Sequence, residues 1–186
     1  MTTKRLALSV LCIVITACTG PTISSEYDPE ALSNFEGYQT YAWQPNPAGT
    51  DARLSPAVGQ LVVGAADEAL VAKGYRLAAA GQPDFLIAWH VTIETRQSVS
   101  EIDITPRAGT PGGRLPGGPA VRQTVPLTRE FNEGTLILDI IDSPTQRHVW
   151  RGWAQGEIQK TVEPGVREKR IREAVRKILD EFPPKP

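Results

Sequence analysis

Alternation of apolar and polar residues predicts β-strands in several segments of the chain. The clearest is 84–95, in which the apolar residues at every second position from Phe85 to Ile93 point to one face. The other predicted strands are 38–43, 135–142 and 148–158, with a short candidate at 75–77. Pro144 lies between the last two strands and favours a hairpin turn there.

Apolar residues at helical spacing predict two helices. The first begins at Ser55-Pro56, where a capping side chain precedes proline at the first helical position, and Gly74 suits its C-terminal cap. The second covers about 165–182, and prolines 183 and 184 end it. Its apolar stripe consists of Ile171, Val175, Ile178 and Leu179.

The order of these elements indicates the fold class. Runs of adjacent strands with segregated helices predict an α+β fold. We expect a two-layer sandwich, with an antiparallel-dominated sheet and two helices covering one face. Residues 38–183 form the single predicted domain.

Residues 98–126 interrupt the pattern, because they are rich in glycine and proline and lack apolar periodicity. One interpretation is a disordered excursion between two strands. The other is a partner-binding loop, helped by Arg107, Arg114 and Arg122 with no acidic residue between them. Its glycine-rich turns lack the Lys-Ser/Thr that follows in a phosphate-binding loop, so we do not expect a nucleotide site.

The N-terminus indicates where the protein resides. Lys4 and Arg5 precede the apolar run Leu6–Ile15, which is too short to span a bilayer, and small residues then lead to Cys18. This resembles a bacterial lipobox, and the resemblance implies that residues 1–17 are a signal peptide and that the Cys18 thiol carries a diacylglyceryl group. The alternatives are an ordinary cleaved signal peptide or an uncleaved membrane helix. In a Gram-negative host, Thr19 rather than an aspartate after the lipidated cysteine favours the periplasmic face of the outer membrane.

Removal of the signal peptide changes the composition in two ways. The mature chain of 169 residues loses Lys4 and Arg5, so its formal net charge moves from −1 to −3, which argues against nucleic-acid binding. Cys12 is discarded and Cys18 carries the lipid, so no thiol is left for a disulfide, a nucleophile or a metal cluster. Residues 18–37 are expected to form a lipidated tether.

The residues that could perform chemistry are few. His90 and His148 show no metal-ligand spacing, and both are interpreted as structural or exposed histidines. Asp139 and Asp142 point to opposite faces of one strand, and no serine lies in a nucleophile elbow. We therefore expect no catalytic residue, no metal and no cofactor.

Two tryptophans suggest a contact surface. Trp150 and Trp153 are three residues apart in a strand, so they face opposite sides of the sheet. One of them should lie on the face away from the helices, where a tryptophan beside an arginine is typical of an interface. The alternative is a tryptophan packed beneath the glycine- and proline-rich segment.

Several segments together resemble a known family. They are YDPEALSNFEGYQTYAW, KGYRL with PDFLIAWHV, GTLILDIIDSPTQRHVWRGWAQG and REAVRKILDEFP. The chain resembles, over roughly 25–183, the uncharacterised bacterial lipoprotein family known as domain of unknown function 4136. The resemblance implies a single-domain lipoprotein and carries no established activity.

These observations lead to a functional hypothesis. We expect a non-enzymatic, lipid-anchored envelope protein that binds another envelope component through the sheet face or the 98–126 segment. A small-ligand or glycan-binding lipoprotein that uses Trp150 or Trp153 for stacking is the alternative, and an envelope hydrolase is the third.

Overall fold

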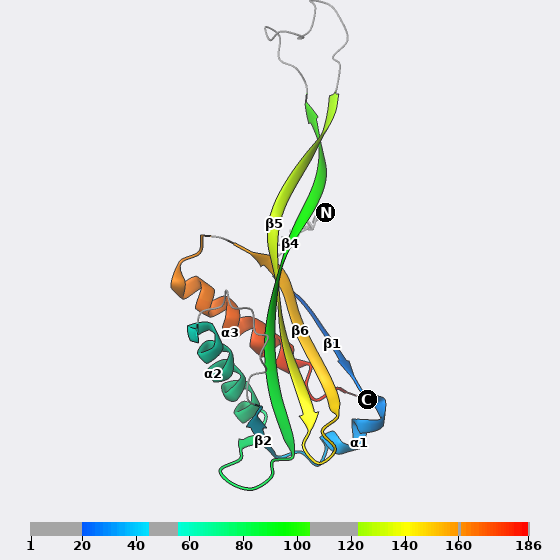
Figure 1. The fold of residues 1–186 in the computed structure, drawn as a ribbon, viewed down its shortest axis with the longest axis vertical. Helices are drawn as coiled ribbons and strands as arrows, with labels where there is room; N and C mark the ends of the chain where they lie inside the picture. The colour runs from blue at the N-terminus through cyan, green and yellow to red at the C-terminus, as the bar shows by residue number, and fades with distance from the viewer. Residues whose placement is uncertain (1–19, 45–55, 105–122, 160, 186) are drawn as a thin grey trace, which may run out of the picture.

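The computed structural model describes residues 20–44, 56–104, 123–159 and 161–185. One six-stranded sheet has the order β1-β6-β5-β4-β2-β3 (Figure 1). The strands are β1 (Thr22–Tyr27), β2 (Thr40–Trp43), β3 (Arg76–Leu77), β4 (Phe85–Ile104), β5 (Gln123–Asp142) and β6 (His148–Ile158). The helices are the 3₁₀ turn η1 (Pro29–Ala31), α1 (Leu32–Phe35), α2 (Pro56–Ala72) and α3 (Pro164–Asp180). The protein is therefore a mixed α and β domain, as predicted.

The sheet is mixed, which corrects the expected antiparallel-dominated sheet. β1, β6, β5 and β4 pair in antiparallel fashion, whereas β2 pairs in parallel with both β3 and β4. The reason is the helix between β2 and β3. A helix that connects neighbouring strands of one sheet returns the chain to the same edge, and the second strand then runs parallel to the first.

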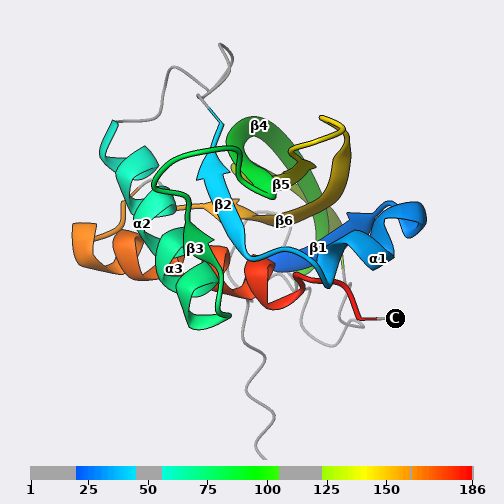
Figure 2. The same cartoon turned by 90° about the horizontal axis from the view of Figure 1, so that it is seen from below.

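The hydrophobic core lies between the sheet and helices α2 and α3 (Figure 2). Alternate residues at the start of β4 enter it, beginning with Phe85 and Ile87, which are both fully buried. Leu70 from α2 and Ile178 from α3 meet this face and are also fully buried. The alternation read from the sequence therefore identifies the core side of the sheet.

Two carboxylates, those of Asp84 and Asp142, accept hydrogen bonds that stabilise the ends of the central strands. Asp84 accepts hydrogen bonds from the backbone amides of Gln39 and Thr40, at 3.0 and 2.8 Å, and from the Thr40 hydroxyl at 2.8 Å. The Gln39 amide is the main cause that lowers the pKa of Asp84 below its ordinary value. Burial raises the pKa of Asp142, but hydrogen bonds from Thr145 and from the Tyr38 hydroxyl outweigh burial, so this pKa is also lowered.

The N-terminal part of the described chain is folded, which corrects the tether expected over residues 18–37. Strand β1 pairs with β6 from Thr22, opposite Gln155, to Tyr27, opposite Trp150. Phe35 is 5% exposed and belongs to the core. Backbone pairing holds this polar segment in place even though its sequence lacks the alternation of a half-buried strand.

Strands β4 and β5 extend beyond the rest of the sheet as a two-stranded arm (Figure 1). Their pairing continues from Phe85 opposite Asp142 to Ile104 opposite Gln123, but β6 accompanies β5 only as far as Asn132. The arm therefore comprises residues 96–104 and 123–131, which at about 3.3 Å per residue is roughly 30 Å long. It includes both flanks of the predicted 98–126 excursion, whereas residues 105–122 lie outside the described residues.

Candidate interaction surface

The sheet has a second face, turned away from the core, which we call the outer face. It is formed by the side chains that alternate with the core residues of the three central strands. On β5 and β6 these include Asp139 paired with Arg151, and Ile137 paired with Trp153. On β4 the outer face includes His90, which is opposite Ile137.

A polar cluster on the outer face joins β4, β5 and β6. The Asp139 carboxylate is fully buried and accepts hydrogen bonds from Arg151, with Nε at 2.6 Å and Nη2 at 3.2 Å. The Nε2 atom of His90 lies 2.7 Å from Asp139 Oδ2, the oxygen that also accepts from Arg151 Nη2. His148 Nδ1 is 4.0 Å from Asp139 Oδ1. The hydrogen bond with Asp139 raises the pKa of the Arg151 guanidinium above its ordinary value.

This geometry indicates a structural role for the cluster. Arg151 and His90 contact both oxygens of the Asp139 carboxylate. These contacts offset the free-energy cost of burying the charged group away from water. Among the described residues, no group of three or more histidine, cysteine, aspartate or glutamate side chains is placed to hold a metal ion. The cluster therefore fixes the register of three neighbouring strands and shapes the surface beside Trp153.

An apolar row continues the outer face along the arm. Ile102 faces Val125 across the two strands, Leu127 faces Ser100, and Phe131 faces Arg96. Ile102 and Leu127 are 42% and 49% exposed. Exposed aliphatic residues in a row on a two-stranded ribbon are unusual for a surface that only contacts water.

Paired charges lie at the base of the arm, next to Phe131 of the apolar row. Arg96 contacts Glu133 at 2.8 Å and Glu94 at 3.1 Å. Arg129 pairs with Glu157 on β6 and lies over the ring of Phe131, with its guanidinium carbon 6.0 Å from the ring centroid. Two arginines thus pair with the three glutamates at the base of the arm, and the apolar row is the distinguishing feature of the rest of this face.

The two tryptophans that the sequence proposed for a contact surface lie in different environments. Trp150 is 1% exposed and lies in the core, so it offers no free surface, which removes it from the candidate interface. Its Nε1 has no hydrogen-bond partner among the described residues. Trp153 lies on the outer face and is partly exposed. Cys18 and the proposed contacts at Arg107, Arg114 and Arg122 lie outside the described residues.

Neither the polar cluster nor the apolar row was predicted from the sequence. His90, Asp139 and Arg151 come from three strands, and only the register of those strands brings them together. The signal that could have found them is the alternation itself. Once Phe85 and Leu138 are assigned to the core, their neighbours one residue away must share the opposite face.

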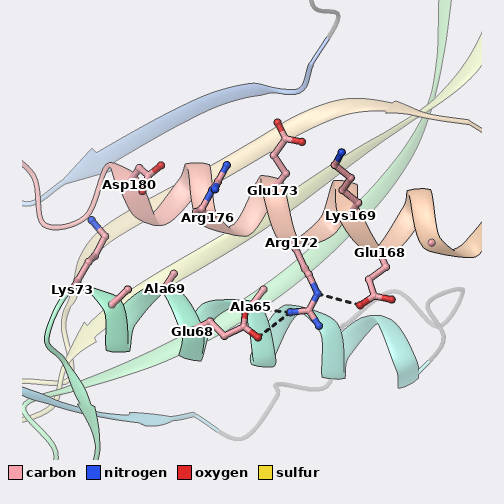
Figure 3. A pocket seen from close by; sticks show the side chains of 12 residues that line it. Ala65, Glu68, Ala69, Lys73, Glu168, Lys169, Arg172, Glu173, Arg176 and Asp180 are labelled. Carbon is pink, nitrogen blue, oxygen red and sulfur yellow. Dashed lines mark hydrogen bonds and ion pairs between the residues drawn. The ribbon is translucent and has the colours of Figure 1, made fainter.

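A groove of about 700 Å³ lies on the helical side of the molecule, between α2 and α3 (Figure 3). Alanines 65, 69 and 72 of α2 line it together with charged residues of both signs. Arg172 spans the groove, 3.1 Å from both Glu68 and Glu168. Because acidic and basic side chains alternate around the groove and pair with one another, it presents no single charge that would select a ligand.

Among the described residues, no helix combines the length and the apolarity needed to cross a bilayer.

Comparison with solved structures finds similar folds at low sequence identity. A PDZ domain protein from Parabacteroides distasonis matches with a TM-score of 0.57 and 12% identity over 90% of this chain. The match covers 37% of that longer chain, so this protein spans little more than a third of its length. A PelC dodecamer from Paraburkholderia phytofirmans matches with a TM-score of 0.47 and 12% identity, over 86% of this chain and 94% of that chain. The first likeness is one of fold alone.

Sequence comparison assigns the family. Among curated proteins, none matches this sequence. The model of the family described as "Domain of unknown function (DUF4136)" matches residues 23–184, which include every strand and helix except the first residue of β1. The chain therefore belongs to the DUF4136 family.

Proposed function

We propose that this protein is a non-enzymatic, lipid-anchored component of the bacterial cell envelope that binds another envelope protein through its outer face and arm. In this proposal α2 and α3 cover one face of the sheet, as in a two-layer sandwich, and the other face is the binding surface. Cys18 carries the lipid, and the outer membrane is the proposed location.

The observation that carries the proposal is the arm. Two strands leave the domain for roughly 30 Å, with Ile102, Leu127 and Phe131 on one face. A two-stranded ribbon of this length has little core of its own, and its free edges are sites where another strand is added. A protein partner that covers the apolar row would offset the cost of exposing it.

The polar cluster supports a binding role more than a catalytic one. Asp139 is saturated by Arg151 and His90, so the cluster makes the outer face rigid at the point where Trp153 is presented. Rigid presentation of a partly exposed tryptophan beside an arginine is typical of protein interfaces.

Trp153 also favours a second candidate function, the binding of a glycan. An indole that is partly exposed on a flat sheet face is a suitable stacking platform for a sugar ring. In this alternative the apolar row of the arm would be unnecessary for binding, and the two functions are therefore separable by experiment.

Site-specific photo-crosslinking in living cells tests the proposal. A photoreactive residue is placed at Leu127 on the arm or at Trp153 on the outer face, with Val71 on α2 as the control, which is 60% exposed. We expect both outer-face positions to yield the same discrete protein adduct and the control to yield none. An adduct only at Val71, or none at any position, would overturn the proposal. Glycan retention lost on Trp153→Ala but unchanged on Leu127→Ser would favour the second function.

The anchor needs its own test. The intact mass of the membrane-extracted protein should show the mature chain plus lipid, and Cys18→Ala should release an unlipidated chain to the soluble fraction. An unlipidated mass in the wild-type protein would refute the lipid anchor.

A further inference from the structure

We infer that the exposed side of α3 next to β1 lies against the membrane and contacts the phosphate groups of anionic lipids. This inference rests on the proposed lipid anchor at Cys18, and it assigns an orientation to the folded domain. The surface is defined by four α3 residues at a spacing of three to four, Val166, Arg170, Glu173 and Lys177, and we call it the α3 stripe.

Chain length places the α3 stripe close to the proposed anchor. The described chain begins at Gly20, and strand pairing fixes it from Thr22 onward. Cys18 precedes Gly20 by two residues, which span at most about 7 Å when fully extended. The Nζ atom of Lys177 lies 4.0 Å from the position that a Cβ would occupy at Gly20. A lipid on Cys18 therefore holds this end of β1, and α3 beside it, within about one headgroup layer of the bilayer.

The charge of α3 suits an anionic surface. The helix contains six basic and three acidic residues, whereas the mature chain as a whole has a formal net charge of −3. The basic residues are Arg167, Lys169, Arg170, Arg172, Arg176 and Lys177. Positive charge is thus concentrated on one element of an otherwise acidic protein, and each lysine or arginine near an anionic membrane contributes about fivefold in binding.

Local contacts leave the α3 stripe available. Lys177 pairs with Glu173 at 2.9 Å, but both side chains are more than a third exposed, so this pair is readily exchanged for a lipid phosphate. Among the described residues, the hydrogen-bond partner of the Arg170 guanidinium is the neutral side chain of Gln159. Val166 is 46% exposed at the end of the stripe, where an apolar side chain would enter the interfacial layer.

The arrangement of layers then sets the direction of the outer face. Helix α3 lies beside β1 on the core side of the sheet (Figure 2). Contact between the α3 stripe and lipid would turn the outer face away from the bilayer. Trp153 and the apolar row would then be presented to the periplasm.

Fluorescence quenching with the lipidated full-length mature protein tests the inference. Its one native cysteine carries lipid, so Val166→Cys introduces a unique thiol for a dye on the α3 stripe. Leu77→Cys, on β3 at the opposite edge of the sheet and 55% exposed, is the matched control. The labelled proteins are placed in phosphatidylcholine vesicles with and without phosphatidylglycerol, and headgroup-attached nitroxide lipid is the quencher.

We expect dye at Val166 to be quenched at least about twofold more than dye at Leu77 when phosphatidylglycerol is present. The difference should collapse in roughly 1 M salt, where the Debye length falls to about 3 Å. The double variant Arg170→Gln, Lys177→Gln should reduce the difference in quenching. The control double variant Lys73→Gln, Arg76→Gln, which changes one residue just after α2 and one on β3, should not reduce it. Neutralisation of the two stripe residues should also weaken vesicle binding of unlipidated Cys18→Ala protein about 25-fold.

The outcomes separate this inference from the proposed function. Equal quenching at both positions in a protein whose mass shows the lipid would overturn the orientation and leave the anchor intact. Preferential quenching at Val166 that does not depend on the salt concentration or on phosphatidylglycerol would overturn the contact with anionic lipids. A wild-type protein without lipid would overturn the proposed anchor, and the orientation would fall with it.

Discussion

Replacement of Asp139 by asparagine should destabilise the domain more than any loss of a surface ion pair. The substitution keeps the shape of the side chain but removes the negative charge that Arg151 and His90 contact. The new amide NH₂ group would also face nitrogen atoms of these side chains in place of an accepting oxygen. The carboxylate is fully buried, whereas the side chains of Arg151 and His90 are 42% and 29% exposed and regain water when the pairing is lost. Loss of one partner from a buried pair costs about 3–5 kcal/mol. Partial hydration of the two donors places the expected cost near the lower limit, at about 3 kcal/mol.

Urea unfolding at neutral pH and low salt, followed by tryptophan fluorescence, measures this change. Glu168→Gln is the matched control, because it removes a carboxylate from an arginine pair on the surface of α3 and should cost less than about 0.5 kcal/mol. A double-mutant cycle with Arg151→Met isolates the pair. An Asp139→Asn variant within about 0.5 kcal/mol of wild type would contradict the argument, because it would mean that the carboxylate is neither buried nor bonded as described.

Two further predictions concern packing and pH. Gly152→Ala should destabilise the domain by about 1–3 kcal/mol, since the added Cβ would clash with the Trp150 ring and would lie 2.6 Å from the Ile178 side chain. Gly64→Ala in α2 meets nothing within 4 Å and should stabilise the domain by about 0.5–1 kcal/mol, and unfolding curves with the opposite order would refute the packing. Asp84→Asn should cost about 1.5–3 kcal/mol at pH 7 through its three hydrogen bonds to the start of β2. Because the pKa of Asp84 is lowered below its ordinary value of 3.8, this stability is present above about pH 4 and is lost as the pH falls through the folded-state pKa. The difference in urea stability between the two proteins should therefore shrink as the pH is lowered below about 4.

The elements that the sequence predicted well are those whose pattern is local. The predicted strand 148–158 matches β6, and Gly74 has a positive φ of 94°, as a helix-terminating glycine requires. The helix predicted over 165–182 corresponds to α3, Pro164–Asp180. In each case the alternation or the cap is written in adjacent residues, so no knowledge of distant contacts was needed.

The elements that the sequence missed depend on distant partners. Residues Thr22–Tyr27 are mostly polar, and only pairing with β6 makes them a strand. The arm makes β4 and β5 longer than the strands predicted at 84–95 and 135–142, each reaching 20 residues. The sequence missed this extension because neither face of the arm enters the core, so the alternation disappears there. The cluster of His90, Asp139 and Arg151 was invisible for a related reason, since strand register and not sequence spacing assembles it.

The missed strand β1 changes what the anchor would do. A flexible tether of twenty residues would let the domain turn freely, and no face would be favoured for partner or lipid. With β1 paired from Thr22, a lipid on Cys18 would act on a rigid edge of the sheet, and in the orientation that we propose the charge of α3 would decide which side turns to the bilayer. The arm would then be held in one orientation relative to the membrane, and a partner protein would find its apolar row already facing the periplasm. Lengthening the segment before Gly20 by a flexible insert should therefore weaken crosslinking at Leu127 while leaving lipidation and folding unchanged.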